Sequence, residues 1–171
     1  MTSSGLVTYP QIVEEKDMSL ALEKLLTPAT ARPERTERAP DSPRLNIAVV
    51  FTSVTPTLAA LRRAGELAAR LSASITLLAP QVVPFPLPLT SPPVLLDFSE
   101  KRFLTIASES KVETMVRIYL CRDKWETLRT ALSPHSLVVV GGRKRFWPTS
   151  EQRLAKRLRK AGHEVIFAET E

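Results

Sequence analysis

Ser136-Leu-Val-Val-Val-Gly-Gly-Arg-Lys-Arg-Phe-Trp-Pro-Thr149 is the stretch of the chain that decides the fold. Its apolar run from Leu137 to Val140 is typical of a strand buried on both faces of a parallel sheet. A double glycine, three consecutive cations and a helix start follow that run. Because open α/β sheets bind ligands at the carboxyl ends of their strands, the stretch predicts an α/β fold and locates a ligand site in it.

The rest of the chain from residue 45 alternates between strand and helix patterns. Such alternation predicts a parallel sheet with right-handed crossovers, so the fold class is α/β, with five strands in a doubly wound sheet. The predicted strands are 46–51, 74–79, 114–120, 137–140 and 165–168. The predicted helices are 55–71, 98–107, 123–132 and 149–161.

Three helix starts carry capping signals. Thr55 precedes Pro56, which suits an N-cap followed by the first helical position. Asp123 with Glu126, and Thr149 with Gln152, have the spacing of capping boxes.

The first 44 residues form an extension to the α/β domain of residues 45–171. The apolar spacing in Gln11–Leu26 is that of an amphipathic helix, and the alternative is that the whole arm is flexible. Residues 27–44 contain four prolines among charged residues, so we expect a flexible linker there.

Residues 80–93 contain six prolines among fourteen residues, and most of the others are apolar. Proline excludes regular helix and central strand, so the pattern predicts an extended, polyproline-like surface segment. Its apolar side chains would be costly to leave in water. They should pack on the fold or on a protein partner.

The positive charge of the chain is concentrated near its carboxyl end. The net charge is +6, yet residues 143–160 alone hold eight cations and one acid, Glu151. This cluster suits a phosphate-bearing ligand, or it is a solvated helix face. We do not expect a nucleic-acid partner. Trp147 is expected to cover its loop, and the alternative is that it stacks on a base.

Several segments resemble a universal stress protein domain. They are Asn46–Ser53, Ser74–Leu78, Cys121–Leu128, Ser136–Arg143 and Ala161–Phe167, and the resemblance covers about residues 45–169. It implies strand order 3-2-1-4-5, as in flavodoxin-like, adenine-nucleotide-binding folds. It further implies a cytoplasmic role in stress or signalling, a homodimer, and ATP or another adenine nucleotide as ligand.

The chain departs from this family at positions that bind ATP. Phe51 stands where ATP-binding members end the first strand with Asp. In the family's G-x2-G-x9-G-[S/T] loop, Gly142 matches the first glycine and Arg145 replaces the second.

The loop after the predicted strand 137–140 and the end of the predicted strand 46–51 could together hold phosphate. Glycines, cations and the N-terminus of a helix favour an anion, and two hydroxyls should lie beside them. The alternative is that these residues only form turns and bind no ligand. The candidate site consists of Thr52, Ser53, Gly141, Gly142, Arg143, Lys144, Arg145, Thr149 and Ser150.

Other chemistry finds little support in the sequence. The chain has no G-x-S-x-G elbow, P-loop or G-x-G-x-x-G, so we expect no enzyme; ATP hydrolysis would need a carboxylate or metal site that the sequence does not offer. His135 and His163 are too isolated to predict a metal site. Cys121 precedes a helix start, where it could be reactive or simply a small buried hydrophobe.

The sequence therefore predicts a binding or regulatory module. The alternative is a protein-interaction module that binds no nucleotide and uses the proline-rich segment 80–93 and the N-terminal arm. A single cysteine, no signal-peptide pattern and no membrane-length apolar run lead us to expect a cytoplasmic protein without membrane association.

Overall fold

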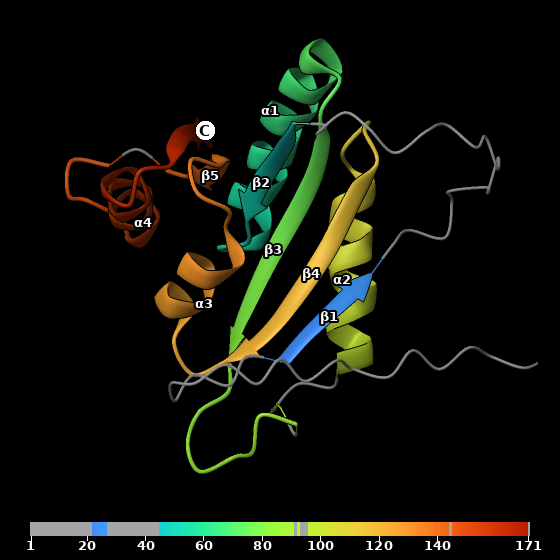
Figure 1. Cartoon of the computed structure of the whole chain (residues 1–171), viewed down its shortest axis with the longest axis vertical. Coiled ribbons are helices and arrows are strands. Elements are labelled where there is room, and N and C mark those ends of the chain that lie inside the picture. Colours follow the sequence, from blue (N-terminus) through green and yellow to red (C-terminus); the bar gives the residue numbers. More distant parts are fainter. Residues whose placement is uncertain (1–21, 27–44, 91, 93–95, 144, 171) are drawn as a thin grey trace, which may run out of the picture.

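The sheet has six strands in the order β1-β4-β3-β2-β5-β6 (Figure 1). This computed structural model describes residues 22–26, 45–90, 92, 96–143 and 145–170. The strands are β1 Leu22–Leu26, β2 Asn46–Val50, β3 Ser74–Val82, β4 Thr114–Cys121, β5 Leu137–Gly142 and β6 Glu164–Glu169. The helices are α1 Val54–Leu71, α2 Leu96–Ser108, α3 Lys124–Ala131 and α4 Ser150–Lys160.

The parallel part of the sheet confirms the predicted fold class. Strands β2 to β6 pair in parallel, and their order in space reads 3-2-1-4-5 when β2 is counted as the first. The fold is therefore a doubly wound α/β sandwich.

Two helices cover each face of the sheet, as the apolar pattern of β2 requires. Ile47 and Val49 face a core shared with α1 and α2, where Leu61 and Phe103 are fully buried. Ala48 and Val50 face the opposite core, which α3 and α4 complete. A strand buried on both faces must be apolar throughout, which explains its uninterrupted hydrophobic sequence.

The N-terminal extension contributes a strand, so the predicted helix over 11–26 is wrong at residues 22–26. These residues form β1, which pairs antiparallel with β4 from Leu22 opposite Leu120 to Leu26 opposite Val116. Without β1, the outer backbone groups of β4 would form an unpaired edge. Pairing at this edge outweighs a local helix preference, which is only a weak guide. Residues 11–21 and the linker 27–44 lie outside the described residues.

The N-cap of helix α1 lies two residues before the predicted N-cap, Thr55. Ser53 is the N-cap, and Thr57 N–H donates to Ser53 O at 3.0 Å. Pro56 thus occupies the third helical position, where its missing N–H is still harmless because the first turn has no acceptors for those groups. At the other end Leu71, which the helical pattern places inward, is 51% exposed.

The proline-rich segment begins as a strand. β3 continues through Pro80, which pairs with Tyr119 of β4, whereas the register of β2 with β3 ends at Leu78. No strand of the described sheet lies beside Pro80 on the β2 side, so its missing N–H breaks no ladder bond there. Beyond β3 the chain turns, with Leu87 N–H donating to Pro84 O at 3.1 Å, in place of the predicted extended segment.

Candidate functional site

The predicted site lies at the carboxyl ends of the adjacent strands β2 and β5. Val50 pairs with Val140, so the chain segments that follow both strands start side by side. Thr52 Oγ1 donates to Gly141 O at 3.4 Å, a long hydrogen bond that links the two segments. The structure thus brings together the two halves of the site that lie about ninety residues apart in sequence.

The two glycines allow close packing of the protein against itself. A Cβ atom on Gly141 would lie 1.7 Å from the carbonyl oxygen of Pro56, in the first turn of α1. A Cβ atom on Gly142 would lie 2.7 Å from the Phe167 ring and 2.8 Å from Cβ of Glu151. Glycine is therefore needed at both positions for α1, α4 and β6 to approach β5. Contact of these glycines with a ligand stays a prediction.

A surface pocket of about 300 Å³ lies beside these glycines. Four of the predicted site residues line it: Ser53, Arg143, Arg145 and Thr149. Thr55, Pro56 and Glu151 complete the lining and were not among the predicted residues. Thr52, Gly141, Gly142 and Ser150 do not line it, and Lys144 lies outside the described residues.

Two helix N-termini meet at this pocket. α1 starts at Ser53 and α4 at Thr149, and both N-caps are lining residues. The N-terminus of a helix presents free N–H groups and the positive end of the helix dipole. The exposed Arg143 and Arg145 add formal positive charge, so the pocket favours an anion.

The N-termini of α1 and α4 differ in how many of their capping hydrogen bonds are already formed within the protein. At α4 the predicted capping box is present: Gln152 N–H donates to the Thr149 hydroxyl at 3.3 Å, and Thr149 N–H donates to Gln152 Oε1 at 3.0 Å. At α1 the Ser53 side chain makes no capping hydrogen bond, and the first turn contains no acidic residue. The α1 side of the pocket is therefore the more available to a ligand.

Glu151 places a carboxylate of the protein itself at the start of α4. Burial disfavours its ionised form, but hydrogen bonds from its own N–H and from the Thr149 and Ser150 hydroxyls outweigh this and hold the pKa of Glu151 below its ordinary value. The carboxylate thus uses donors that a bound phosphate would use. An acid in the first turn of a helix is a helix-start signal, so the sequence could have indicated this residue.

Phe51 makes the end of β2 apolar. Its ring packs edge-to-face on Phe103 of α2, with centroids 4.8 Å apart, and the Arg102 guanidinium lies 5.9 Å from its centroid. Phe51 N–H donates to Leu78 O at 2.8 Å, so its backbone continues the sheet pairing. A polar ligand group gains no side-chain partner from this position.

The Cys121 side chain is fully buried at the end of β4. Burial raises the pKa of the Cys121 thiol, although a hydrogen bond with Thr127 and the charge of Lys124 act in the opposite direction. Its Sγ lies 3.5 Å from Gln81 O. A raised pKa keeps the thiol protonated at neutral pH, and the thiolate is the nucleophile.

The two histidines lie near each other beside Gly162. His135 Nδ1 is 3.2 Å from Gly162 O, and burial together with His135 lowers the pKa of His163. Among the described residues, no group of three or more His, Cys, Asp or Glu side chains could hold a metal ion.

Trp147 does not cover the loop that follows β5. It is 79% exposed, and the neighbouring Phe146 is 96% exposed. The interpretation of Trp147 as a loop cover is therefore wrong, and both rings are free to contact a ligand.

Comparisons with protein-family models and with curated proteins find no match for this chain. Within the described part of the chain, none of the helices combines the length and apolarity needed to cross a bilayer.

Proposed function

We propose that this protein is a binding or regulatory module that holds the phosphates of a nucleotide, ATP or another adenine nucleotide, in the pocket between α1 and α4. The observation that carries the proposal is the convergence of Arg143 and Arg145 with two helix N-termini on one pocket. Guanidinium groups and helix N–H groups are the usual partners of phosphate oxygens. The volume of about 300 Å³ suits a phosphate chain better than a whole nucleotide.

Recognition of the ligand should rest on its phosphates. Phe51 offers no polar contact at the end of β2, and its ring is committed to Phe103. The base and ribose would then extend from the pocket and contribute little affinity. A polyphosphate nucleotide should therefore bind more tightly than its nucleoside.

Glu151 makes the proposed binding conditional. Its carboxylate already receives the donors at the start of α4, so a phosphate there must displace it. Two anions so close together repel each other. This arrangement suits a weak, regulated site in which ligand binding moves Glu151 and the start of α4.

The remaining features of the proposal come from the sequence resemblance to universal stress proteins. They are a role in stress or signalling, assembly as a homodimer and a cytoplasmic location. The absence of catalysis is proposed on a different ground, because the sequence lacks the usual catalytic motifs. The doubly wound sheet is compatible with them, but a fold of this kind hosts many functions.

Calorimetry with ATP and with adenosine tests the proposal. ATP should bind and adenosine should not, and added salt should weaken ATP binding because it screens exposed charges. Replacing Arg143, Lys144 and Arg145 together by Ala should abolish the preference. The matched control replaces Arg62, Arg70 and Lys111, three exposed cations that do not line the pocket, by Ala.

The control removes the same charge and should retain ATP binding. An equal loss of ATP binding in both triple variants would mean that ATP responds only to the net charge of the protein and not to the pocket. The absence of heat with ATP at millimolar concentration would refute the nucleotide proposal.

The exposed turn after β3 favours a second candidate, a protein-interaction module. Phe85 is 82% exposed, and its ring lies 4.1 Å from the Arg122 guanidinium. Arg122 also donates to Val83 O at 2.6 Å and to Leu87 O at 2.7 Å, so it holds the turn in place. An exposed aromatic side chain on a turn that hydrogen bonds fix in place is typical of residues that anchor a protein partner.

Photo-crosslinking in cells tests this second candidate. A crosslinker at position 85 should give a discrete adduct, whereas one at the exposed position 70 should not. Replacing Arg122 by Ala should weaken the adduct because the turn loses its hydrogen bonds. No adduct at position 85, or the same adducts at both positions, would contradict it.

A further inference from the structure

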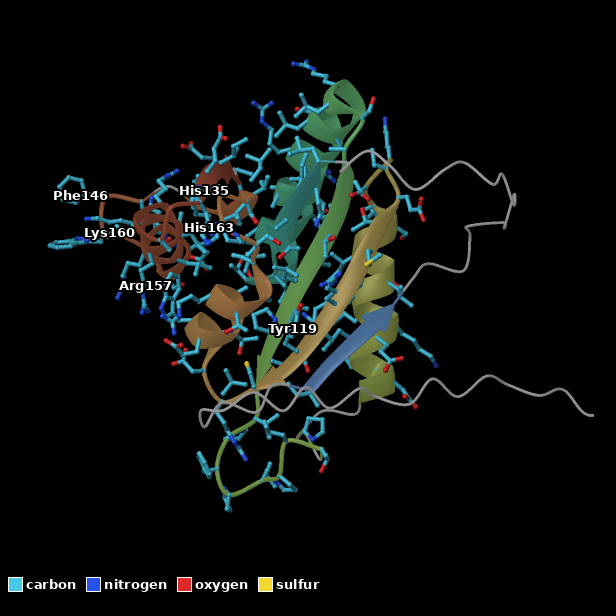
Figure 2. All side chains as sticks on the ribbon, viewed as in Figure 1. Tyr119, His135, Phe146, Arg157, Lys160 and His163 are labelled. Atoms are coloured by element: carbon cyan, nitrogen blue, oxygen red, sulfur yellow. The ribbon has the colours of Figure 1, made fainter. Side chains whose placement is uncertain are left out.

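The loop between β5 and α4 presents two large aromatic side chains to solvent. Phe146 and Trp147 are 96% and 79% exposed, and their rings meet edge-to-face with centroids 6.0 Å apart. In Figure 2, Phe146 projects from the loop beyond α4, on the side away from the sheet. Two exposed aromatic rings in contact are typical of surfaces that bind a partner.

A stripe of three cations runs along α4 from the same loop. Arg153, Lys156 and Lys160 are exposed and lie at i, i+3 and i+7, so they share one face of the helix. The stripe extends roughly 10 Å along the helix axis, at about 1.5 Å per residue. The apolar face of α4, with Ala155 and Leu158, is buried against the sheet.

The neighbouring cations of α4 already have partners. The Arg157 guanidinium stacks on Trp125 at 4.3 Å from the ring centroid, and Arg159 Nη2 donates to Val165 O at 3.1 Å. Within the described part of the chain, the stripe residues Arg153, Lys156 and Lys160 have no such contact. The stripe is therefore free to neutralise charge on a ligand.

We propose that Phe146, Trp147 and this stripe bind single-stranded nucleic acid. Bases stack on the two aromatic rings, and the phosphates that follow lie along Arg153, Lys156 and Lys160. Exposed aromatics beside a track of cations are the two elements that bind single strands without sequence preference. A duplex cannot use the two rings in this way because its bases are already stacked on one another.

The structure favours a nucleic acid over an anionic membrane. A helix that lies in a membrane interface inserts an exposed apolar face into the lipid and carries its basic residues on the polar face. The apolar face of α4 is buried in the protein, so only the loop tip could insert. A single strand needs only the rings and the charges that this surface presents.

Fluorescence of Trp147 tests the proposal directly. In the Trp125→Phe variant Trp147 is the one remaining tryptophan. An oligothymidylate of about 15 nucleotides, within the range of known single-strand sites, should quench its emission without a blue shift. Inorganic polyphosphate of matched charge should bind more weakly and leave the emission unchanged, because it has no bases.

Anisotropy of the labelled oligonucleotide then separates stacking from charge. Trp147→Ala should weaken binding by roughly five- to a hundredfold. Replacing Arg153, Lys156 and Lys160 by Gln should lower the slope of log affinity against log salt by about 2. The control variant replaces Arg62, Arg70 and Lys111 by Gln. It should leave the affinity for the oligonucleotide and the salt slope unchanged.

These outcomes are independent of the nucleotide pocket, because Trp147→Ala leaves Arg143, Arg145 and both helix N-termini in place. Loss of oligonucleotide binding with ATP binding retained is the expected result. Equal binding of polyphosphate and oligonucleotide, or an affinity unchanged in Trp147→Ala, would overturn the proposal. Blue-shifted emission with phosphatidylserine vesicles, without quenching by the oligonucleotide, would overturn it in favour of a membrane surface.

Discussion

Gly141→Ala should destabilise the fold strongly, although it adds a single methyl group. The new Cβ would lie 1.7 Å from Pro56 O and 2.4 Å from Pro56 C, distances that non-bonded atoms cannot adopt. Both atoms belong to the backbone, so a side-chain rotation cannot relieve the clash. The first turn of α1 must move away from β5.

The expected loss is at the upper end of the range for overpacked cores, about 3 kcal/mol. For a chain of this size that corresponds to a fall in Tm of roughly 6–12 °C. Thermal unfolding followed by circular dichroism measures it, with urea unfolding for the free energy.

Gly65→Ala is the matched control, because a Cβ there meets nothing within 4 Å and Gly65 lies inside α1. Alanine in a helix interior is favoured over glycine by about 1 kcal/mol, so this variant should be as stable as the parent or more stable. If Gly141→Ala unfolds at the temperature of the parent, the close packing of α1 on β5 is refuted.

Two further predictions concern the caps and the buried thiol. Thr149→Ala should lower the free energy of unfolding by about 1 kcal/mol, since it removes the capping hydrogen bond from Gln152 N–H. The control Thr105→Ala, on the exposed face of α2, should change the free energy of unfolding little. Equal unfolding midpoints of the two variants in urea would contradict this prediction. Because burial raises the pKa of Cys121, the unfolded chain loses the thiol proton first as pH rises, so the contribution of this group to stability is present at neutral pH and is lost in alkali. A thiol-specific disulfide reagent should accordingly react slowly at neutral pH and quickly in urea, and rapid reaction of the folded protein would show that Cys121 is accessible.

The sequence was sufficient for those parts of the fold that rest on local or strongly periodic signals. The apolar run before Gly141 predicts a central strand because a strand buried on both faces has no room for polar residues. Asp123 and Thr149 were predicted as N-caps, and their side chains accept hydrogen bonds from Glu126 N–H and Gln152 N–H. These signals act within four residues, so tertiary structure does not alter them.

The parts that the sequence could not predict depend on contacts between distant segments. Residues 22–26 pair with β4, and nothing local to Leu22 indicates an open edge nearly a hundred residues away. The role of Gly141 depends on Pro56 lying against it. The exposure of Trp147 depends on where the loop leaves the sheet, which neither its charge nor its aromatic content specifies.

The central claim, that phosphate binds between α1 and α4, is tested most directly by the affinity of Glu151→Gln for ATP. Removing a charge a few ångströms from the ligand is worth about 1 kcal/mol in water, so ATP should bind at least about fivefold more tightly than to the parent. The control Glu66→Gln makes the same change of charge at an exposed position of α1 and should alter the affinity by less than about twofold. An affinity for ATP that is unchanged in Glu151→Gln, or increased equally in Glu66→Gln, would contradict binding at this pocket.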